Sequence, residues 1–147
     1  MKRSMMQIYV DGSDKAVELY QKAFDAELIW SVPNDEGDGT YYHAELNIYG
    51  QVLAIAEAKV MLGVQNTPSE EMVSFFSQRD RIPGNTMQFC LHFGESKEDI
   101  VHKAYDVLKE GAKILTPLGP CDFSPLMTDF IDKFGVKFIL YRNWYGD

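Results

Sequence analysis

The sequence predicts an α+β fold in which two tandem βαβββ modules form a cupped mixed sheet, with helices on its convex face. Two stretches, Met5–Val10 and Thr86–Phe93, carry this prediction because apolar and polar residues alternate along both. A period of two is typical of a strand that buries one face. In both places a turn follows, and after it apolar residues recur at helical spacing. The same order of elements occurs twice, which indicates an internal duplication.

Length, composition and charge limit the class of protein. The 147 residues suffice for one domain with a buried core, and 46% hydrophobic with 24% charged residues is typical of a globular chain. The net charge of −8 disfavours binding to nucleic acids and to anionic membrane surfaces. No apolar run approaches the roughly 20 residues of a membrane span, and no signal-peptide run opens the chain. We therefore expect a cytoplasmic protein without nucleic-acid or membrane partners.

The first module is expected over residues 4–58. Its helix follows a turn at Asp11-Gly12-Ser13 that can cap it, and its last two strands are joined by a tight turn at Gly50-Gln51. Glu57 follows the last strand and is expected to be solvated. The expected elements are a strand over Met5–Val10, a helix over Asp14–Phe24, and strands over Ala26–Val32, Tyr41–Tyr49 and Val52–Ala56.

A connector over residues 59–84 and a second module over residues 85–142 are expected to follow. A helix is predicted to begin in the connector at Thr67-Pro68-Ser69-Glu70, which combines an N-cap, a first-turn proline and a capping-box glutamate. In the second module Ser96 can cap the helix, and Pro117–Pro125 is interpreted as a loop. The expected strands are Thr86–Phe93, Ala112–Thr116, Leu126–Ile131 and Val136–Tyr141.

The strand faces that point away from the core have an unusual composition. The two halves align with Val10 opposite Phe93 and Gly50 opposite Gly135, so equivalent faces can be compared. These faces are too polar for a core and too uncharged for a freely solvated surface. We therefore expect them to line a half-buried cavity that binds a small molecule. The candidate ligand-binding residues are Gln7, Tyr9, His43, Glu45, Gln88, Cys90, His92 and Tyr141.

Three segments of the chain resemble a known family. They are Tyr9–Ala26, Tyr42–Ala56 with its His-Ala-Glu-Leu sequence, and Gly111–Leu140 with its Gly-Ala, Pro-Leu and Asp-Lys-Phe-Gly sequences. Through them the chain is similar to the vicinal oxygen chelate superfamily, which covers glyoxalase I, extradiol dioxygenases, and bleomycin and fosfomycin resistance proteins. Within it the chain most resembles the PhnB-like group, often labelled from a demethylubiquinone methyltransferase-like domain. The resemblance implies paired βαβββ modules and a homodimer.

The resemblance also implies where a divalent metal ion would bind. Enzymes of the superfamily hold the ion with side chains from the first and last strands of each module. The matching positions in this chain are Met5, Ala54, Gln88 and Ile139. Of these, only Gln88 carries a good ligand atom, so we expect no standard metal site and no cofactor. A register shift of two residues would bring in Gln7 or Cys90 instead.

Three functions remain open from the sequence. The first is a metal-free protein that binds a small molecule and has no assignable reaction. The second is an enzyme, either a metal-dependent lyase, isomerase or dioxygenase, or an acid–base catalyst that uses His43 or His92 with Glu45. The third is a resistance-type protein that sequesters a drug. His43 and Glu45 are equally compatible with a structural hydrogen bond between strands, and the catalytic residues are unknown.

Overall fold

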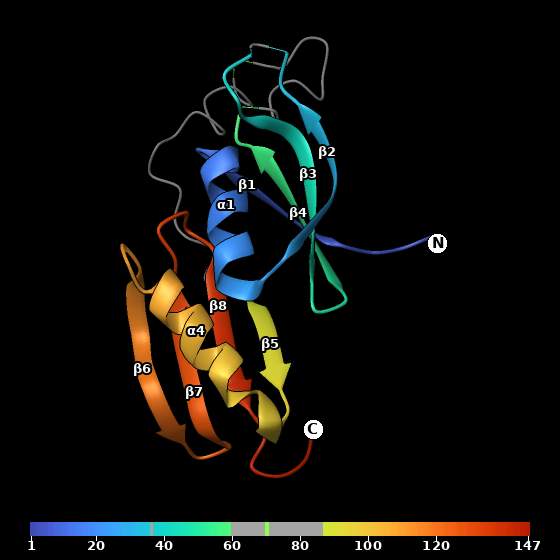
Figure 1. Ribbon diagram of the computed structural model, residues 1–147. Helices are drawn as coiled ribbons and strands as arrows, with labels where there is room; N and C mark the ends of the chain where they lie inside the picture. The colour runs from blue at the N-terminus through green and yellow to red at the C-terminus, as the bar shows by residue number, and fades with distance from the viewer. Residues whose placement is uncertain (36, 60–69, 71–86) are drawn as a thin grey trace. The chain divides into compact units, whose positions relative to one another are not determined.

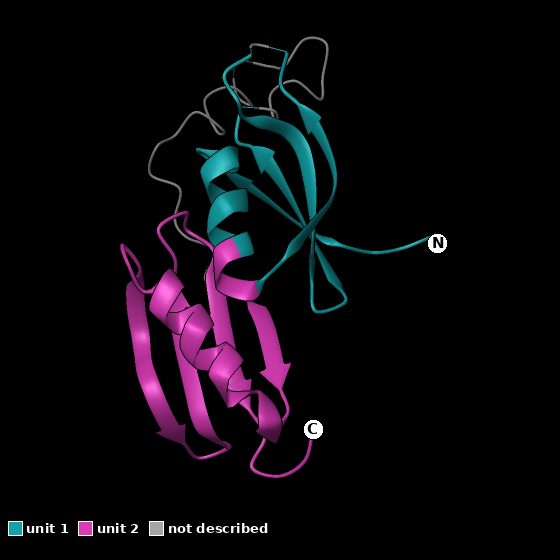
Figure 2. Cartoon of the chain, in the orientation of Figure 1, with its two compact units in different colours: residues 1–21, 25–81 teal, residues 22–24, 82–147 magenta. Residues whose placement is uncertain are grey.

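The computed structural model describes residues 1–35, 37–59, 70 and 87–147 (Figure 1). It divides into two compact units, Met1–Gln21 with Asp25–Arg81, and Lys22–Phe24 with Ile82–Asp147 (Figure 2). The helix predicted to begin at Thr67-Pro68-Ser69-Glu70 lies outside the described residues, apart from Glu70. No helix in the described part of the chain combines the length and the hydropathy that a membrane span requires.

The first module has the predicted order of one strand, one helix and three strands. Its elements are β1 (Met6–Val10), α1 (Ser13–Phe24), β2 (Glu27–Pro33), β3 (Tyr41–Ile48) and β4 (Gln51–Glu57). β1 runs parallel to β4, while β3 pairs antiparallel with both β4 and β2. The sheet order is therefore β1-β4-β3-β2, which makes a mixed four-stranded sheet.

The second module repeats this arrangement strand for strand. Its elements are β5 (Phe89–Phe93), the 3₁₀-helix η1 (Glu95–Lys97), α4 (Glu98–Leu108), β6 (Lys113–Cys121), β7 (Ser124–Ile131) and β8 (Lys137–Arg142). The sheet order is β5-β8-β7-β6, again with a parallel pair between the first and last strands. The predicted α+β fold with two βαβββ modules is confirmed, and each module forms a sheet of its own.

One face of each sheet is buried, as the alternation predicts. In the second module α4 packs against β7 and β8, and the ring of Phe138 lies 5.8 Å from Phe89 and 5.7 Å from Phe130. Burial of this apolar area is the main stabilising contribution to each module. The buried apolar side chains include Val10, Tyr20, Leu46, Ile48, Leu53 and Ile55 in the first module, and Leu91, Val101, Leu108, Phe130, Phe138 and Leu140 in the second.

The prediction of a loop over Pro117–Pro125 is wrong. β6 continues to Cys121 and β7 begins at Ser124, so only two residues form the turn between them. β6 is the edge strand of its sheet, and proline is tolerated on an edge because its missing N–H costs no ladder hydrogen bond there. Shifts in the register between β6 and β7 also accommodate the irregular sequence. Pro117 and Pro120 therefore mark an edge strand rather than a loop, and Pro125 lies near the start of β7.

The start of the second helix also differs from the prediction. Ser96 lies in η1, and α4 begins at Glu98 without a side-chain cap. The C-terminal residues bind this turn instead, because the Asp147 carboxylate accepts a 2.7 Å hydrogen bond from the Ser96 N–H. The Gly146 carbonyl accepts a second one, 2.8 Å long, from the Glu95 N–H. The bond from Ser96 lowers the pKa of Asp147.

Glu57 caps the first helix, so the expectation that it is solvated is wrong. Only 8% of this residue is exposed, and its two carboxylate oxygens accept hydrogen bonds of 2.9 Å from the Gly12 N–H and 2.7 Å from the Ser13 N–H. The first turn of a helix leaves N–H groups without intrahelical partners and carries partial positive charge. A carboxylate at the end of β4 therefore satisfies these groups and fixes where α1 begins.

Replacing Glu57 with alanine should lower the free energy of unfolding by about 2 kcal/mol, because two helix-terminal N–H groups lose their acceptor in a buried setting. Urea denaturation followed by far-ultraviolet circular dichroism measures this change. Glu18→Ala is the matched control, since Glu18 is an exposed carboxylate on the same helix and its loss should cost less than about 0.5 kcal/mol. Equal losses for the two variants would contradict the capping role.

Candidate functional site

A row of four residues, each paired with its neighbour on the next strand, crosses one face of the first sheet. This face is opposite the one that carries the buried apolar core residues. Gln7 on β1 pairs with Ala54 on β4, Ala54 pairs with Glu45 on β3, and Glu45 pairs with Trp30 on β2. Directly paired residues project to the same side of a sheet, so these four side chains share one face. Ala54 is small and buried, which leaves Gln7 and Glu45 on either side of it as the polar groups of the row.

Glu45 is the centre of a polar cluster on this face, which comprises Arg3, Trp30, His43 and Glu45. The residue is 1% exposed, and both of its carboxylate oxygens accept 2.7 Å hydrogen bonds from the two terminal nitrogens of Arg3. His43, two residues away on the same face, places Nε2 3.0 Å from Oε1 of Glu45. The Trp30 and His43 rings lie 5.3 Å apart at a tilt of 54°.

The electrostatics of this cluster keep Glu45 ionised at neutral pH. The hydrogen bonds from Arg3 lower the pKa of Glu45 most, burial opposes them, and the bond to His43 lowers the pKa further. A buried carboxylate is tolerated when a cation and hydrogen bonds compensate for the lost hydration. When His43 donates Nε2–H to Glu45, its Nδ1 is the nitrogen left to accept a proton. The pair is therefore arranged as an orienting carboxylate and a candidate base.

The second sheet carries an equivalent row. Cys90 on β5 pairs with Ile139 on β8, Ile139 pairs with Asp129 on β7, and Asp129 pairs with Thr116 on β6. Asp129 thus occupies the position that Glu45 holds in the first module. Its Oδ1 is buried and has no hydrogen-bond donor among the described residues, and the nearest cation, Lys137 Nζ, lies 3.8 Å away.

An aromatic cluster follows this row on the same face. The rings of His92 and Tyr141 stack at 4.4 Å with an angle of 16°, and Phe123 meets Tyr141 edge-on at 5.5 Å. His92 Nε2 is hydrogen-bonded to the side-chain oxygen of Asn143. Burial raises the pKa of Tyr141, and its contact with the Cys90 thiol raises it further. Tyr141 therefore stays a neutral phenol at any physiological pH.

The structure brings most of the predicted site residues together within their own modules. His43 and Glu45 are bonded, Cys90 contacts Tyr141, and Tyr141 stacks on His92. Gln7 lies in the row with Glu45, and Tyr9 is on the same face, paired with Ala56. Gln88 is the exception, because it is exposed and precedes β5.

Sequence reasoning missed five residues of these faces. Arg3 precedes the first strand and gives no periodic signal, and Trp30 follows a register shift in β2 that disturbs the alternation. Asp129 is hidden by a difference in turn length, since two residues join β3 to β4 and five join β7 to β8. An alignment on Gly50 and Gly135 consequently places Glu45 opposite the wrong residue. The missed residues are Arg3, Trp30, Phe123, Asp129 and Asn143.

A comparison with protein families matches residues 3–140 to the model of the Glyoxalase/Bleomycin resistance protein/Dioxygenase superfamily. The chain belongs to this superfamily. The match confirms the resemblance found in the sequence. A search of curated protein sequences finds no significant match.

Solved structures with the same fold extend over nearly the whole chain. A putative 3-demethylubiquinone-9 3-methyltransferase, PhnB protein, from Bacillus cereus has 22% identity and a TM-score of 0.69, covering 96% of this chain and 99% of that one. Protein PA1353 from Pseudomonas aeruginosa has 16% identity and a TM-score of 0.68, with coverages of 97% and 98%. A mutant of the fosfomycin resistance protein FosX from Listeria monocytogenes, complexed with Mn(II), has 15% identity and a TM-score of 0.59, with coverages of 96% and 91%. At these identities the likeness shows the fold alone.

The residues of this superfamily member do not fit a standard metal site. The register places Gln7, not Met5, beside Ala54, and Cys90, not Gln88, beside Ile139. Alanine and isoleucine have no ligand atoms, and Glu45 is already bonded to Arg3 through both oxygens. Within the described residues, no three His, Cys, Asp or Glu side chains are grouped closely enough to hold an ion together.

Replacing Arg3 with alanine should raise the pKa of Glu45, because the largest cause of its lowering is removed. A lowered pKa stabilises the fold above the ordinary value for glutamate, about 4.3, and this stabilisation disappears as the pH falls through the lowered pKa. Wild type should therefore exceed Arg3→Ala in unfolding free energy at pH 7, and the difference should shrink below a pH of about 4. Urea denaturation across this range measures it, with Lys2→Ala as control. A difference independent of pH would refute the assignment.

Proposed function

We propose that this protein is a PhnB-like member of the superfamily that binds a small organic molecule at the polar faces of its sheets and works without the standard metal ion. The single observation that carries the proposal is the cluster around Glu45. A charged carboxylate is held there almost without solvent exposure, while Trp30 beside it remains 53% exposed. An aromatic surface next to a few fixed polar groups is typical of small-molecule sites.

The alternative to ligand binding is that the cluster only stabilises the sheet. The ion pair is weak evidence for a stabilising role, because the cost of removing the Glu45 charge from water offsets its attraction to the exposed Arg3. An apolar pair at these positions would hold the sheet as well, and it would not need an arginine from outside the strands. The polar arrangement is better explained by a ligand that makes hydrogen bonds with it.

A second candidate function is acid–base catalysis by His43. The 3.0 Å contact between His43 and Glu45 favours it, since a carboxylate that holds one imidazole nitrogen orients the other toward a substrate. A protein that sequesters a drug would use the same face without a reaction. The class of ligand that binds, a drug or a metabolite, distinguishes this function from catalysis. Pairing into a homodimer stays a prediction from the family resemblance.

Trp30→Ala should weaken binding of an aromatic ligand roughly tenfold, because stacking on an exposed indole contributes about 1 kcal/mol or more. A thermal-shift screen of aromatic metabolites and drugs identifies the ligand, and isothermal titration calorimetry gives its affinity for wild type and for each variant. The matched control is Trp144→Ala, since Trp144 is similarly exposed, at 48%, and lies in the C-terminal segment outside the strands of both sheets. Loss of binding in the control but not in Trp30→Ala would overturn the proposed site.

Metal analysis tests the proposal that the protein works without the standard metal ion. The protein purified from metal-supplemented medium should contain far less than one equivalent of Mn, Zn, Fe, Co or Ni per chain, because Ala54 and Ile139 lack ligand atoms and Glu45 is bonded to Arg3. Inductively coupled plasma mass spectrometry measures this content. FosX, whose structure contains Mn(II), serves as the positive control under the same conditions. A stoichiometric ion that is lost on replacing Glu45 or Gln7 would refute the metal-free assignment.

A further inference from the structure

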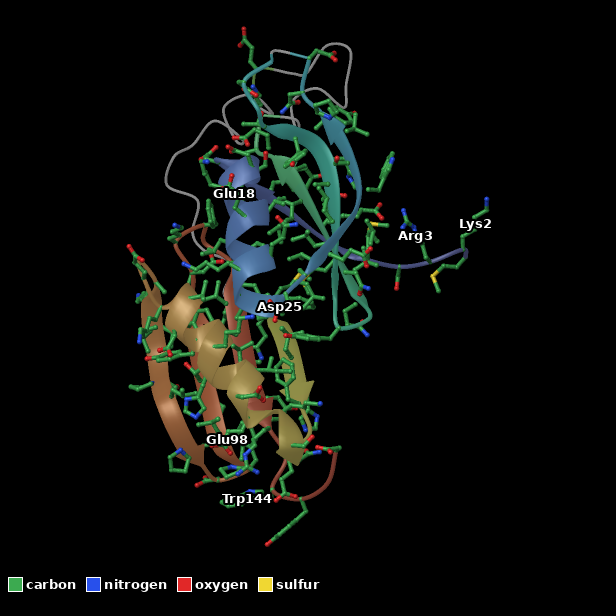
Figure 3. The ribbon with its side chains drawn as sticks, viewed as in Figure 1. Lys2, Arg3, Glu18, Asp25, Glu98 and Trp144 are labelled. Carbon is green, nitrogen blue, oxygen red and sulfur yellow. The ribbon has the colours of Figure 1, made fainter. Side chains whose placement is uncertain are left out.

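The two partners of the Arg3–Glu45 ion pair differ in how firmly the fold holds them. Glu45 lies in β3, a strand paired on both sides, and its side chain is 2% exposed. The Arg3 side chain is 54% exposed, and it belongs to a segment before β1 in which Met1, Lys2 and Ser4 are also exposed. Figure 3 shows Lys2 farther out from the strands than Arg3. The carboxylate is therefore fixed, whereas the guanidinium can leave for water.

The geometry of the pair defines what could replace Arg3. Two parallel hydrogen bonds of 2.7 Å join the two terminal nitrogens to the two carboxylate oxygens. Only a planar cation with two N–H groups side by side reproduces this fork, which an ammonium cannot do. An anion would have to displace the buried Glu45 from Arg3, and the chain's net charge of −8 would repel it.

The surroundings of Glu45 add an aromatic requirement. Trp30 pairs with Glu45 across the sheet, and His43 contacts both: the His43 and Trp30 ring centres are 5.3 Å apart, and His43 Nε2 is 3.0 Å from Oε1 of Glu45. A cation seated on Glu45 would hold a neighbouring ring close to the exposed Trp30 indole. Both stacking and cation–π attraction favour such a ligand.

We propose that the ligand carries an amidinium or guanidinium group on an aromatic ring, and that this cation takes the place of the Arg3 side chain on Glu45. The inference rests on the proposed small-molecule function and specifies its ligand class. Arg3 then acts as an internal competitor that occupies the carboxylate when no ligand is present. The affinity measured for wild type is accordingly reduced by the fraction of molecules in which Arg3 is bound.

The decisive experiment measures the affinity of three probes of one shape by calorimetry: benzamidine as the cation, benzamide as the neutral analogue and benzoate as the anion. Wild type should bind benzamidine most tightly. Arg3→Ala should bind it about threefold to tenfold more tightly than wild type, because the competitor is gone. The affinity for benzamide should change little between wild type and Arg3→Ala. Glu45→Gln should weaken the binding of benzamidine by about tenfold or more, because the charged partner is lost.

Lys2→Ala is the matched control. It removes one positive charge from the same exposed segment but does not touch Glu45, so it should leave the affinity for benzamidine unchanged. A gain equal to that of Arg3→Ala would mean that net charge alone is responsible, which overturns the assignment. If Glu45→Gln does not fold, the comparison of Arg3→Ala with Lys2→Ala decides the matter.

The remaining outcomes separate this inference from the function on which it rests. If neutral or anionic aromatic compounds bind in a Trp30-dependent way and Arg3→Ala gives no gain for benzamidine, the small-molecule function stands and the cation assignment is wrong. If no aromatic compound of any charge binds to wild type or to Arg3→Ala, both are wrong. Weaker benzamidine binding by Arg3→Ala than by wild type would show that Arg3 helps the ligand instead of competing with it, and the cation assignment would again be wrong.

Discussion

The parallel pairing of the first and last strands in each module is the constraint on which the rest depends. Hydrogen bonds between β1 and β4 put Gln7 beside Ala54, and those between β5 and β8 put Cys90 beside Ile139. Because side chains alternate along a strand, a slip of one residue would turn every polar group into the core. The register thus decides which residues are buried in the core and which lie on the polar face of each sheet.

The same backbone supports two different surfaces because the central strands differ. In the first sheet the central positions are Ala54 and Ala56, so side chains from the neighbouring strands dominate the face. In the second sheet the equivalent positions are Ile139 and Tyr141, which are large and fill it. The duplication therefore supplied two similar sheets with different surfaces. The small residues of the first sheet leave room for a charged cluster at its centre. The large residues of the second sheet fill its face, where Tyr141 is part of an aromatic stack.

Much of the fold could be predicted from sequence, since the alternation of apolar residues and the repeated order of elements are local signals. The pairing of His43 with Glu45 was also within reach, because residues two apart share one side of a strand. Arg3 could not be found in this way, as it lies 42 positions from Glu45 and outside any element. The prediction for Glu57 failed for a similar reason, because its partners are the backbone N–H groups of Gly12 and Ser13 in a turn that is distant in the sequence.

The residue pairs at the C-terminal ends of the two parallel strand pairs show how far the modules have diverged. Val10 pairs with Glu57 in the first module, and Phe93 pairs with Arg142 at the equivalent point of the second. Glu57 holds the start of α1, whereas Arg142 binds Glu98 of α4 at 2.8 Å and Asp147 holds the preceding turn. The modules are consequently no longer interchangeable parts. A chimera built from two copies of the first would carry its helix cap in each, while copies of the second cut at Arg142 would lose the hydrogen bonds that Gly146 and Asp147 accept from the turn before α4.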